Sequence, residues 1–424
     1  MTITGRTQPP LFPVNIKTSI PVRPAKLDNG ARVCLIEAGT EDIMRMEFVF
    51  RAGIVNDYVP LLASSANMML TEGTANYTAE ALNRILDYYG VFLSPGCARD
   101  TAGLTLYFLS RHFAKVLELA EEILFKPAFQ QKELDLLMNK RLRWYLVGRE
   151  KVQNLAMDRF FESVFGPHHP YGRQVREEDF GNITPAVLKD FHSKFYTPET
   201  MAVIISGRIP GDAVNLLEKS FGQLHSKKIF IENNPAVLKG YGRRKVHLKK
   251  PGAVQTAIRI GSSAINIRHP DYPGLKFLNV MLGGYFGSRL MKNIREKNGF
   301  TYGIHSTVSS FDQSGFKVIS TEVGNQYRKR AAEEIYREIM KLRTVPVPPE
   351  EMEVVRNYMT GEMVRMFDGP FALAESYKSI WEFGLDDNYY AGFAEMIKTI
   401  TPDELMRLAE KYYNIEDLYE ITAG

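Results

Sequence analysis

A short sequence recurs at half the length of the chain. The tetrapeptide at 67–70, Asn-Met-Met-Leu, returns at 279–282 as Asn-Val-Met-Leu, 212 residues later in a chain of 424 residues. Each copy follows an apolar run with small residues and a loop that contains Asp-Tyr, and each leads into a glycine turn. Because self-similarity at a fixed period is the signature of a repeated structural unit, this match predicts two homologous domains.

Both halves alternate strand-like and helix-like segments. In the first half, runs rich in β-branched and aromatic residues predict strands at RVCLIEA, RMEFVFR, AGLTLYFL and MAVIISG. Segments with the apolar spacing of helices lie at 77–89, 111–124 and 130–165. The second half predicts strands at AVQTAIRI and GFKVISTEV and helices at 326–342, 349–367, 371–383 and 402–413. This alternation is typical of an α/β or α+β fold.

A polar, irregular run separates the two halves. Residues 222–242 contain Asn-Asn-Pro and Gly-Tyr-Gly, which break regular structure. We therefore expect an N-terminal domain at 1–225, a linker at 226–242 and a C-terminal domain at 243–424. Each unit is long enough to bury its own apolar core.

Composition excludes several classes of protein. With 45% hydrophobic and 24% charged residues, the chain has the profile of a soluble globular protein. Its 53 basic and 49 acidic residues leave a net charge of +4, which does not by itself imply a nucleic-acid or membrane partner. The two cysteines, Cys34 and Cys97, exclude a disulfide scaffold and are typical of a reducing compartment. Since no run approaches 18 apolar residues, we expect a soluble, cytoplasmic protein.

Three motifs carry a resemblance to a known family. They are HHPYG at 168–172, FHSKFYTPETMAVIISG at 191–207 and GGYFGSRLMKNIREKNGFTYG at 283–303. Together with the two-half arrangement they resemble the pitrilysin-like zinc peptidases, which include two-domain bacterial members and the subunits of mitochondrial processing peptidase. The resemblance implies an α+β fold of two homologous domains related by a pseudo-twofold repeat. Each would have a roughly six-stranded, mostly antiparallel sheet with helices packed on one face, and two such units would close around a peptide.

Active members of that family carry His-x-x-Glu-His on the first helix after the second strand. Two His four residues apart bind zinc from one helix face, and the Glu between them acts as general base. Alignment on the Gly-Thr at 73–74 places three other residues at these positions, in order Ser64, Asn67 and Met68. A neutral hydroxyl and a thioether are poor zinc ligands, and an amide cannot accept a proton. The resemblance therefore implies that both the metal and the base are lost.

The remaining zinc ligand of the family is also missing. The resemblance places this Glu in the run 141–145, near Trp144, where the chain has RLRWY and no carboxylate. None of the eight His is followed three or four residues later by His, Asp or Glu, so no helical pair of ligands exists elsewhere. A site assembled from residues distant in sequence is not tested by this spacing. We expect no metal and no cofactor in this chain, with zinc only in a partner subunit.

The second half keeps a different part of the family's machinery. Arg295 and Tyr302, in REKNGFTY, match an Arg and Tyr pair that in active members reaches across the chamber to the substrate carbonyl. A guanidinium and a phenol can both stabilise the oxyanion of amide hydrolysis. The alternatives are a surface ion pair of Arg295 with Glu296 or another neighbour, and a half-buried strand position for Tyr302.

The resemblance also assigns contacts with substrate. In active relatives the strand after the helix that ends at Gly90 carries Asn-Ala and pairs with the peptide as an added strand. Here Ser94 and Pro95 take those places, and proline removes one backbone donor. Ser94, together with Gly283 and Gly284 of the glycine turn, is predicted to bind substrate.

These observations favour a non-catalytic subunit of a zinc-dependent peptidase. It would pair with a homologous chain that keeps the zinc motif, contribute Arg295, Tyr302 and part of the chamber wall, and take peptides as substrate; a homodimer is also compatible. The alternative is a peptide-binding or structural assembly subunit with no catalytic role. A third possibility is an enzyme with relocated chemistry. The sequence shows no specific nucleophile or acid pair that would support it, and GGYFGS lacks the spacing of phosphate-binding motifs.

Overall fold

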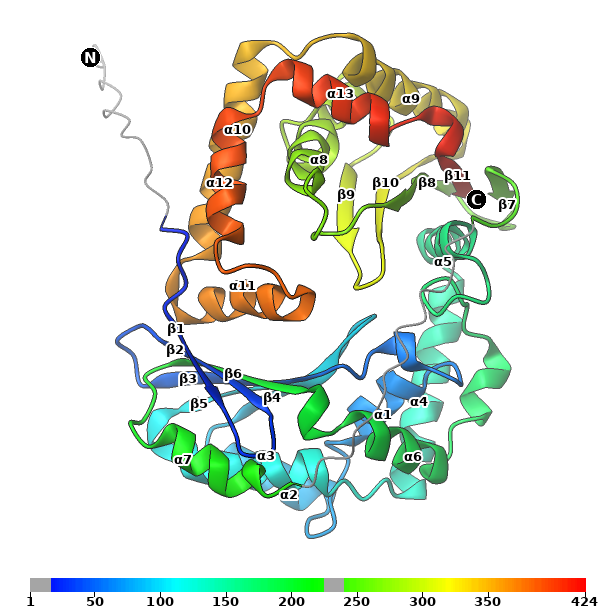
Figure 1. Cartoon of the computed structure of the whole chain (residues 1–424). Helices are drawn as coiled ribbons and strands as arrows, with labels where there is room; N and C mark the ends of the chain where they lie inside the picture. Colours follow the sequence, from blue (N-terminus) through cyan, green and yellow to red (C-terminus); the bar gives the residue numbers. More distant parts are fainter. Residues whose placement is uncertain (1–16, 225–239) are drawn as a thin grey trace, which may run out of the picture.

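The first half of the chain builds a six-stranded sheet. The computed structural model describes residues 17–224 and 240–424, and Figure 1 shows one sheet in each half. The strand order in the first sheet is β1-β2-β6-β3-β5-β4, with only the β2–β6 pair parallel. The strands are Val22–Lys26 (β1), Arg32–Glu37 (β2), Ile43–Phe50 (β3), Phe92–Cys97 (β4), Ala102–Leu109 (β5) and Met201–Gly207 (β6).

The second half repeats this topology. Its strand order is β7-β11-β8-β10-β9, with only the β7–β11 pair parallel. The strands are Lys245–Leu248 (β7), Gln255–Ala264 (β8), Ile304–Ser310 (β9), Gly315–Gly324 (β10) and Tyr419–Ala423 (β11). Read in that order they correspond to β2, β6, β3, β5 and β4, so the prediction of an α+β fold with two homologous units is confirmed. The described part of the second sheet has five strands because nothing in it corresponds to β1.

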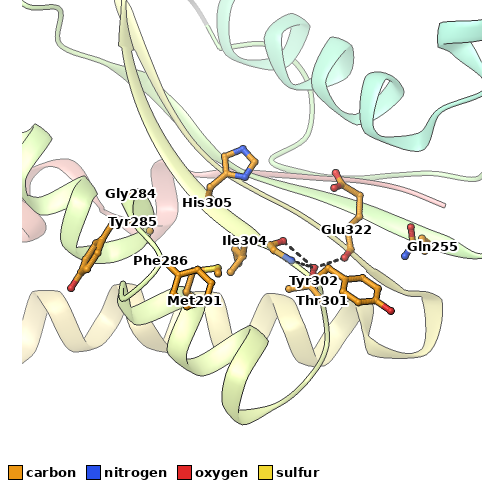
Figure 2. Close-up of a pocket in the computed structure, with 12 residues that line it drawn as sticks. Gln255, Gly284, Tyr285, Phe286, Met291, Thr301, Tyr302, Ile304, His305 and Glu322 are labelled. Atoms are coloured by element: carbon orange, nitrogen blue, oxygen red, sulfur yellow. Dashed lines mark hydrogen bonds between the residues drawn. The ribbon is translucent and has the colours of Figure 1, made fainter. Parts of the chain in front are cut away.

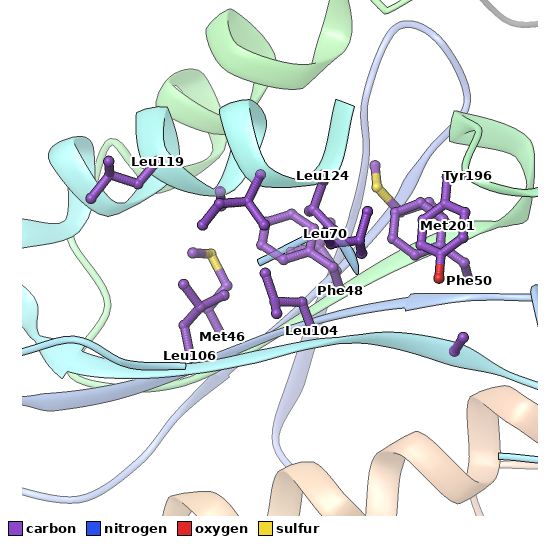
Figure 3. Packing of buried hydrophobic residues seen from close by; sticks show 14 of the residues in the cluster. Met46, Phe48, Phe50, Leu70, Leu104, Leu106, Leu119, Leu124, Tyr196 and Met201 are labelled. Carbon is purple, nitrogen blue, oxygen red and sulfur yellow. The ribbon is translucent and has the colours of Figure 1, made fainter. Parts of the chain in front are cut away.

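Each sheet packs one face against helices of its own half. Alternation along β3 places Met46, Phe48 and Phe50 on that face, where they join Leu104 and Leu106 of β5 in the larger core (Figure 3). Fully burying a side chain of this kind stabilises the fold by about 1.5–3 kcal/mol. The helices of the first half are Leu62–Met69 (α1), Ala79–Tyr88 (α2), Phe113–Phe125 (α3), Gln131–Arg149 (α4), Pro185–Phe195 (α6) and Ala213–Leu217 (α7). Those of the second half are Tyr272–Asn279 (α8), Arg328–Thr344 (α9), Pro349–Met366 (α10), Tyr389–Thr399 (α12) and Pro402–Tyr412 (α13).

The opposite face of each sheet is covered by a helix from the other half. Val152–Phe165 (α5) comes from the first half and packs on β8 and β11, whereas Gly369–Phe383 (α11) comes from the second half and packs on β2 and β6 (Figure 1). Leu373 of α11 joins Val49 and Ile204 in one buried cluster. Phe160 of α5 joins Ile421 in another. The sequence predicted helices on one face only, and this exchange adds a cover to the second face.

A buried arginine in the same strand of each sheet holds the exchanged helix. Arg45 of β3 is 2% exposed, pairs with Glu47 at 2.5 Å and donates to the carbonyl of Phe371 on α11 at 3.1 Å. Arg259 of β8 donates to the carbonyl of Gln153 on α5 at 3.3 Å. Since β3 and β8 correspond in the repeat, the two halves are tied together by equivalent contacts.

Some elements differ from the sequence prediction. The single helix expected at 130–165 is two helices, because Lys151 adopts an extended backbone conformation between α4 and α5. The prediction missed α6, α7, α8 and α12 and several short strands. The expected linker at 226–242 lies largely outside the described residues, so its position and the domain boundaries stay predictions. Within 17–224 and 240–424, no helix combines the length and apolar character needed to span a membrane.

Candidate functional site

Helix α1 carries the positions of the lost zinc motif. Its first turn is capped by Asp57, whose Oδ1 accepts from the N–H of Ala63 at 2.6 Å. Burial raises the pKa of Asp57 to about 7, against the hydrogen bond from Ala63 and the charges of Arg173 and Arg141. Ser64 is half-buried and Met68 is exposed, so these two motif positions lie on the accessible side of the helix.

Asn67, at the position of the catalytic Glu, is a structural residue. Its Nδ2 donates to the carbonyl of Gly103 at 2.9 Å and to the hydroxyl of Tyr196 at 3.2 Å, inside the core. The repeated Asn279 also bonds to its own sheet, with Nδ2 donating to the carbonyl of Ser306 at 3.0 Å, although Ser306 lies on β9, which corresponds to β4, and Gly103 lies on β5. Because the same residue ties helix to sheet in both halves, Asn67 is explained by packing.

Arg141 of α4 reaches the motif helix. Its Nη2 donates to Ser64 Oγ at 2.7 Å and its Nη1 to Ser65 Oγ at 2.6 Å. Trp144, where the alignment placed the third zinc ligand, is 69% exposed. Burial lowers the pKa of Arg141, yet a guanidinium stays protonated in proteins. A fixed positive charge therefore bridges α1 and α4 at the motif positions.

The residues at this place do not fit a zinc ion. Two hydroxyls, a thioether and a guanidinium replace the imidazoles and carboxylate that zinc requires. Within the described parts of the chain, no group of three or more His, Cys, Asp or Glu is arranged to hold a metal ion. The chemistry of the donors thus argues against metal binding at α1.

The predicted Arg and Tyr lie beside one cavity in the second half. Arg295 belongs to the π-helical segment Met291–Lys297, and its guanidinium stacks 4.7 Å from the ring centre of Phe286. Among the described residues it has no ion-pair partner. Tyr302 is 94% exposed and precedes β9 instead of lying within it. Neither alternative, a surface ion pair or a half-buried strand tyrosine, describes these side chains.

The turn that carries Tyr302 is held by hydrogen bonds. Thr301 Oγ1 donates to the carbonyl of Glu322 at 2.7 Å, and the N–H of Gly303 donates to Thr301 Oγ1 at 3.1 Å (Figure 2). Thr321 Oγ1 donates to the carbonyl of Gly303 at 2.9 Å. The backbone on both sides of Tyr302 is therefore fixed while its ring projects into solvent.

The cavity has a volume of about 540 Å³. It brings together the predicted Gly283, Gly284 and Tyr302 with Phe286, His305 and Glu322, as Figure 2 shows for most of them. Glu322 pairs with Arg259 at 2.8 Å. Burial and the charge of Arg259 lower the pKa of His305, which favours its neutral form.

Ser94 lies elsewhere, on the edge strand of the first sheet. It is exposed on β4, the last strand of that sheet, with Pro95 next to it. The corresponding edge strand of the second sheet, β9, is partly covered by side chains of α8. Lys276 Nζ donates to the carbonyl of Val308 at 3.1 Å and Asn279 to that of Ser306, so α8 occupies its outward carbonyls. Of these two equivalent edges, only β9 has carbonyls that accept hydrogen bonds from helix side chains among the described residues.

The sequence reasoning missed two residues of these sites. Arg141 falls on the face of α4 that also carries Leu134, Leu137 and Met138, and a charge within a buried apolar stripe is a signal that could have identified it. Phe286 stands in a glycine-rich turn, where no periodicity indicates that its ring meets Arg295.

Comparisons with known proteins agree with this geometry. Residues 182–359 match the family described as Peptidase M16 inactive domain. The chain is 21% identical over 302 residues to the uncharacterized zinc protease YmxG of Bacillus subtilis, covering 70% of this chain and 72% of that protein. It is 21% identical to the non-peptidase homolog YmxG of Helicobacter pylori, covering 84% and 83%. It spans little more than half, 56%, of a zinc protease of Mycobacterium leprae.

A solved structure has the same fold. The crystal structure of a peptidase M16 inactive domain from Pseudomonas fluorescens superposes with a TM-score of 0.84 at 22% identity, covering 95% of this chain and 98% of that one. The two-unit architecture is therefore shared along nearly the whole described chain.

Proposed function

The chain belongs to the pitrilysin-like (M16) peptidase family as a member without the zinc motif, and from this premise we propose that it is the non-catalytic subunit of a two-chain peptidase. A homologous partner would supply zinc and the general base. This chain would supply part of the chamber wall and the pair Arg295 and Tyr302. Peptides are the expected substrate.

One observation carries the proposal. Tyr302 is held outward on a fixed turn, and Arg295 lies beside the same cavity without an ion-pair partner among the described residues. Neither side chain uses its polar donors in a hydrogen bond within the described parts of the fold, so these donors stay accessible to a substrate. Side chains that keep their donors free and fixed are suited to a charge that develops on a substrate.

The chemistry divides between the two chains. Zinc in the partner would polarise the scissile carbonyl and activate water for attack. As the carbonyl oxygen gains negative charge, the guanidinium of Arg295 and the phenol of Tyr302 would donate hydrogen bonds to it. Removing one such donor typically lowers kcat by about 10²–10³-fold.

The test uses the chain alone and mixed with a zinc-bearing homologue. Cleavage of a peptide should be absent with this chain alone and appear in the mixture. Arg295→Ala and Tyr302→Phe should each lower kcat of the mixture about 10²-fold or more without changing its zinc content. Arg84→Ala, which removes an exposed helical ion pair with Glu80, is the matched control. A fully active Arg295→Ala mixture would refute the catalytic role.

A peptide-binding or assembly subunit is the second candidate. An exposed apolar surface favours it, since Trp144 and Val147 are 69% and 57% exposed on α4, the helix whose Arg141 contacts the lost zinc helix. Exposed aromatic anchors are typical of binding surfaces. Under this alternative Trp144→Ala would abolish association with a partner or peptide, while Arg295→Ala would leave association with a partner unchanged.

A further inference from the structure

Within the described parts of the chain, an unpaired positive charge lies next to the cavity beside Tyr302, behind its lining residue Phe286. Glu322 is the acid that lines the cavity, and its pairing with Arg259 offsets the two charges. His305 is held toward its neutral form by burial, with a lowered pKa. Arg295, which touches the lining residue Phe286, adds a further positive charge with no acid within ion-pair distance among the described residues. A negatively charged ligand is therefore favoured.

Phe286 keeps this charge available. Its ring is 64% exposed and lies under the guanidinium of Arg295 at 4.7 Å. Stacking on an aromatic face restrains a guanidinium through its plane and leaves the N–H groups at its edge free. An ion pair in the same place would use those donors. Phe286 is thus a positioning residue for Arg295.

The partly covered edge of β9 limits which ligands can extend from the cavity. The cavity lies at the start of β9, beside Gly283 and Gly284. Lys276 and Asn279 occupy the carbonyls of Val308 and Ser306 further along that strand. A peptide that continued from the cavity along β9 would meet two carbonyls that already accept hydrogen bonds. In the chain without its zinc-bearing partner, the end of a peptide fits this geometry better than its middle.

We propose that this cavity binds the C-terminal carboxylate of a peptide. The planar guanidinium of Arg295 would bind the two carboxylate oxygens side by side, a match that a lysine cannot make. The phenol of Tyr302 would donate a further hydrogen bond, and Phe286 would hold Arg295 in place. The choice of peptide as ligand rests on the proposed function, whereas the preference for a free carboxylate follows from the cavity itself.

The experiment measures peptide binding by the full-length chain without any partner. The probes are a fluorescein-labelled hexapeptide of Ala, Leu and Ser with a free C-terminus and the same peptide amidated, compared by fluorescence anisotropy. We expect the acid to bind at least tenfold more tightly than the amide. Arg295→Gln should abolish the difference and Arg295→Lys should restore only part of it.

Further variants test positioning. Phe286→Leu should reduce the preference severalfold with an unchanged Tm, whereas Phe286→Tyr should retain it. Tyr302→Phe should weaken acid binding more than amide binding. Arg84→Gln, remote from the cavity, should behave as the unmodified chain. A preference that survives Arg295→Gln would overturn the assignment of Arg295.

Two outcomes would overturn the proposal as a whole. One is equal binding of acid and amide, and the other is tight binding of an amidated peptide with a terminal Glu, which would identify a side-chain carboxylate as the ligand. Activation of a zinc-bearing partner is measured separately with an amidated substrate. If Arg295 is needed for that activation but acid and amide bind equally, the subunit function stands and this inference falls. If the acid preference depends on Arg295 while activation does not, this inference stands and the catalytic role of Arg295 in the subunit falls.

Discussion

The guanidinium of Arg45, in the first sheet, donates a 3.1 Å hydrogen bond to the carbonyl of Phe371, which lies 326 residues later in the sequence. The same guanidinium pairs with buried Glu47, and Lys378 of α11 pairs with that carboxylate at 2.5 Å. The network joins the sheet of one half to a helix of the other. Its loss should therefore weaken the whole molecule.

Arg45→Met should lower the free energy of unfolding by about 3–5 kcal/mol, because it leaves the buried charge of Glu47 with less compensation. Denaturant unfolding measures this. Arg84→Met, which removes an exposed i,i+4 pair, should cost about 0.5 kcal/mol or less. If both variants unfold at the same denaturant concentration, the network does not hold the halves together.

Arg141 should keep zinc out even when the motif is restored. The triple variant Ser64→His, Asn67→Glu, Met68→His supplies the family's helix ligands, but the guanidinium that now contacts Ser64 would stand beside the metal and repel it. We expect the triple variant to purify without zinc by elemental analysis. Adding Arg141→Met should raise its zinc content, and adding Arg143→Met, an exposed arginine on the same helix, should not. Zinc in the triple variant alone would contradict this account.

Lys317 should make stability increase at alkaline pH. It is buried in β10, contacts Ser262 and lies 5.4 Å from the ring centre of Tyr413, and burial lowers its pKa to about 8. Between about pH 8 and the usual lysine pKa of 10.4 the unfolded chain binds more protons, so the free energy of unfolding rises with pH there.

Lys317→Met should remove that rise and stabilise the chain at pH 7 by about 2–4 kcal/mol. Thermal unfolding across pH 7–10 checks both effects. Lys329→Met, at an exposed position of α9, should preserve the slope. An unchanged pH profile in Lys317→Met would show that Lys317 is not the source.

Asp57 should make the free energy of unfolding decrease as pH rises, in a lower pH range than Lys317. Its folded-state pKa of about 7 lies above the usual value near 3.9, so the folded chain binds more protons between these limits and stability falls as pH rises through them. Asp57→Asn keeps an oxygen to accept from Ala63 and has no charge to bury. Its stability should vary less between pH 4 and 7 and exceed that of the unmodified chain at pH 8. A variant that keeps the full slope would refute this assignment.

Local sequence pattern was sufficient for most of the separate elements. The helix predicted at 77–89 is α2, and Thr78 caps its start, with Oγ1 accepting from the N–H of Ala81. The repeat at 67–70 and 279–282 predicted the pseudo-symmetry, and in both copies the asparagine side chain ties its helix to the sheet of its own half. These features depend on residues close in sequence, or on a match between two copies.

The packing of elements that are distant in sequence could not be predicted from local sequence pattern. The apolar face of α11 indicates that it is buried but not which sheet covers it, so its packing against Ile204 was not predicted. The position of Arg141 against Ser64 depends on how α4 lies across α1, so an alignment that placed the family's ligand near Trp144 did not indicate this contact. Likewise, nothing adjacent in sequence indicates that Phe286 stacks on Arg295.

The exchange of α5 and α11 also sets an order of events during synthesis. The first sheet is complete once β6 ends at Gly207, yet the helix that covers its second face begins only at Gly369, 162 residues later. At about 5–20 residues per second, that face waits roughly 8–32 seconds for its cover. Throughout that interval the growing chain presents an apolar sheet surface, with Val49 and Ile204 in it, to whatever binds nascent proteins near the ribosome.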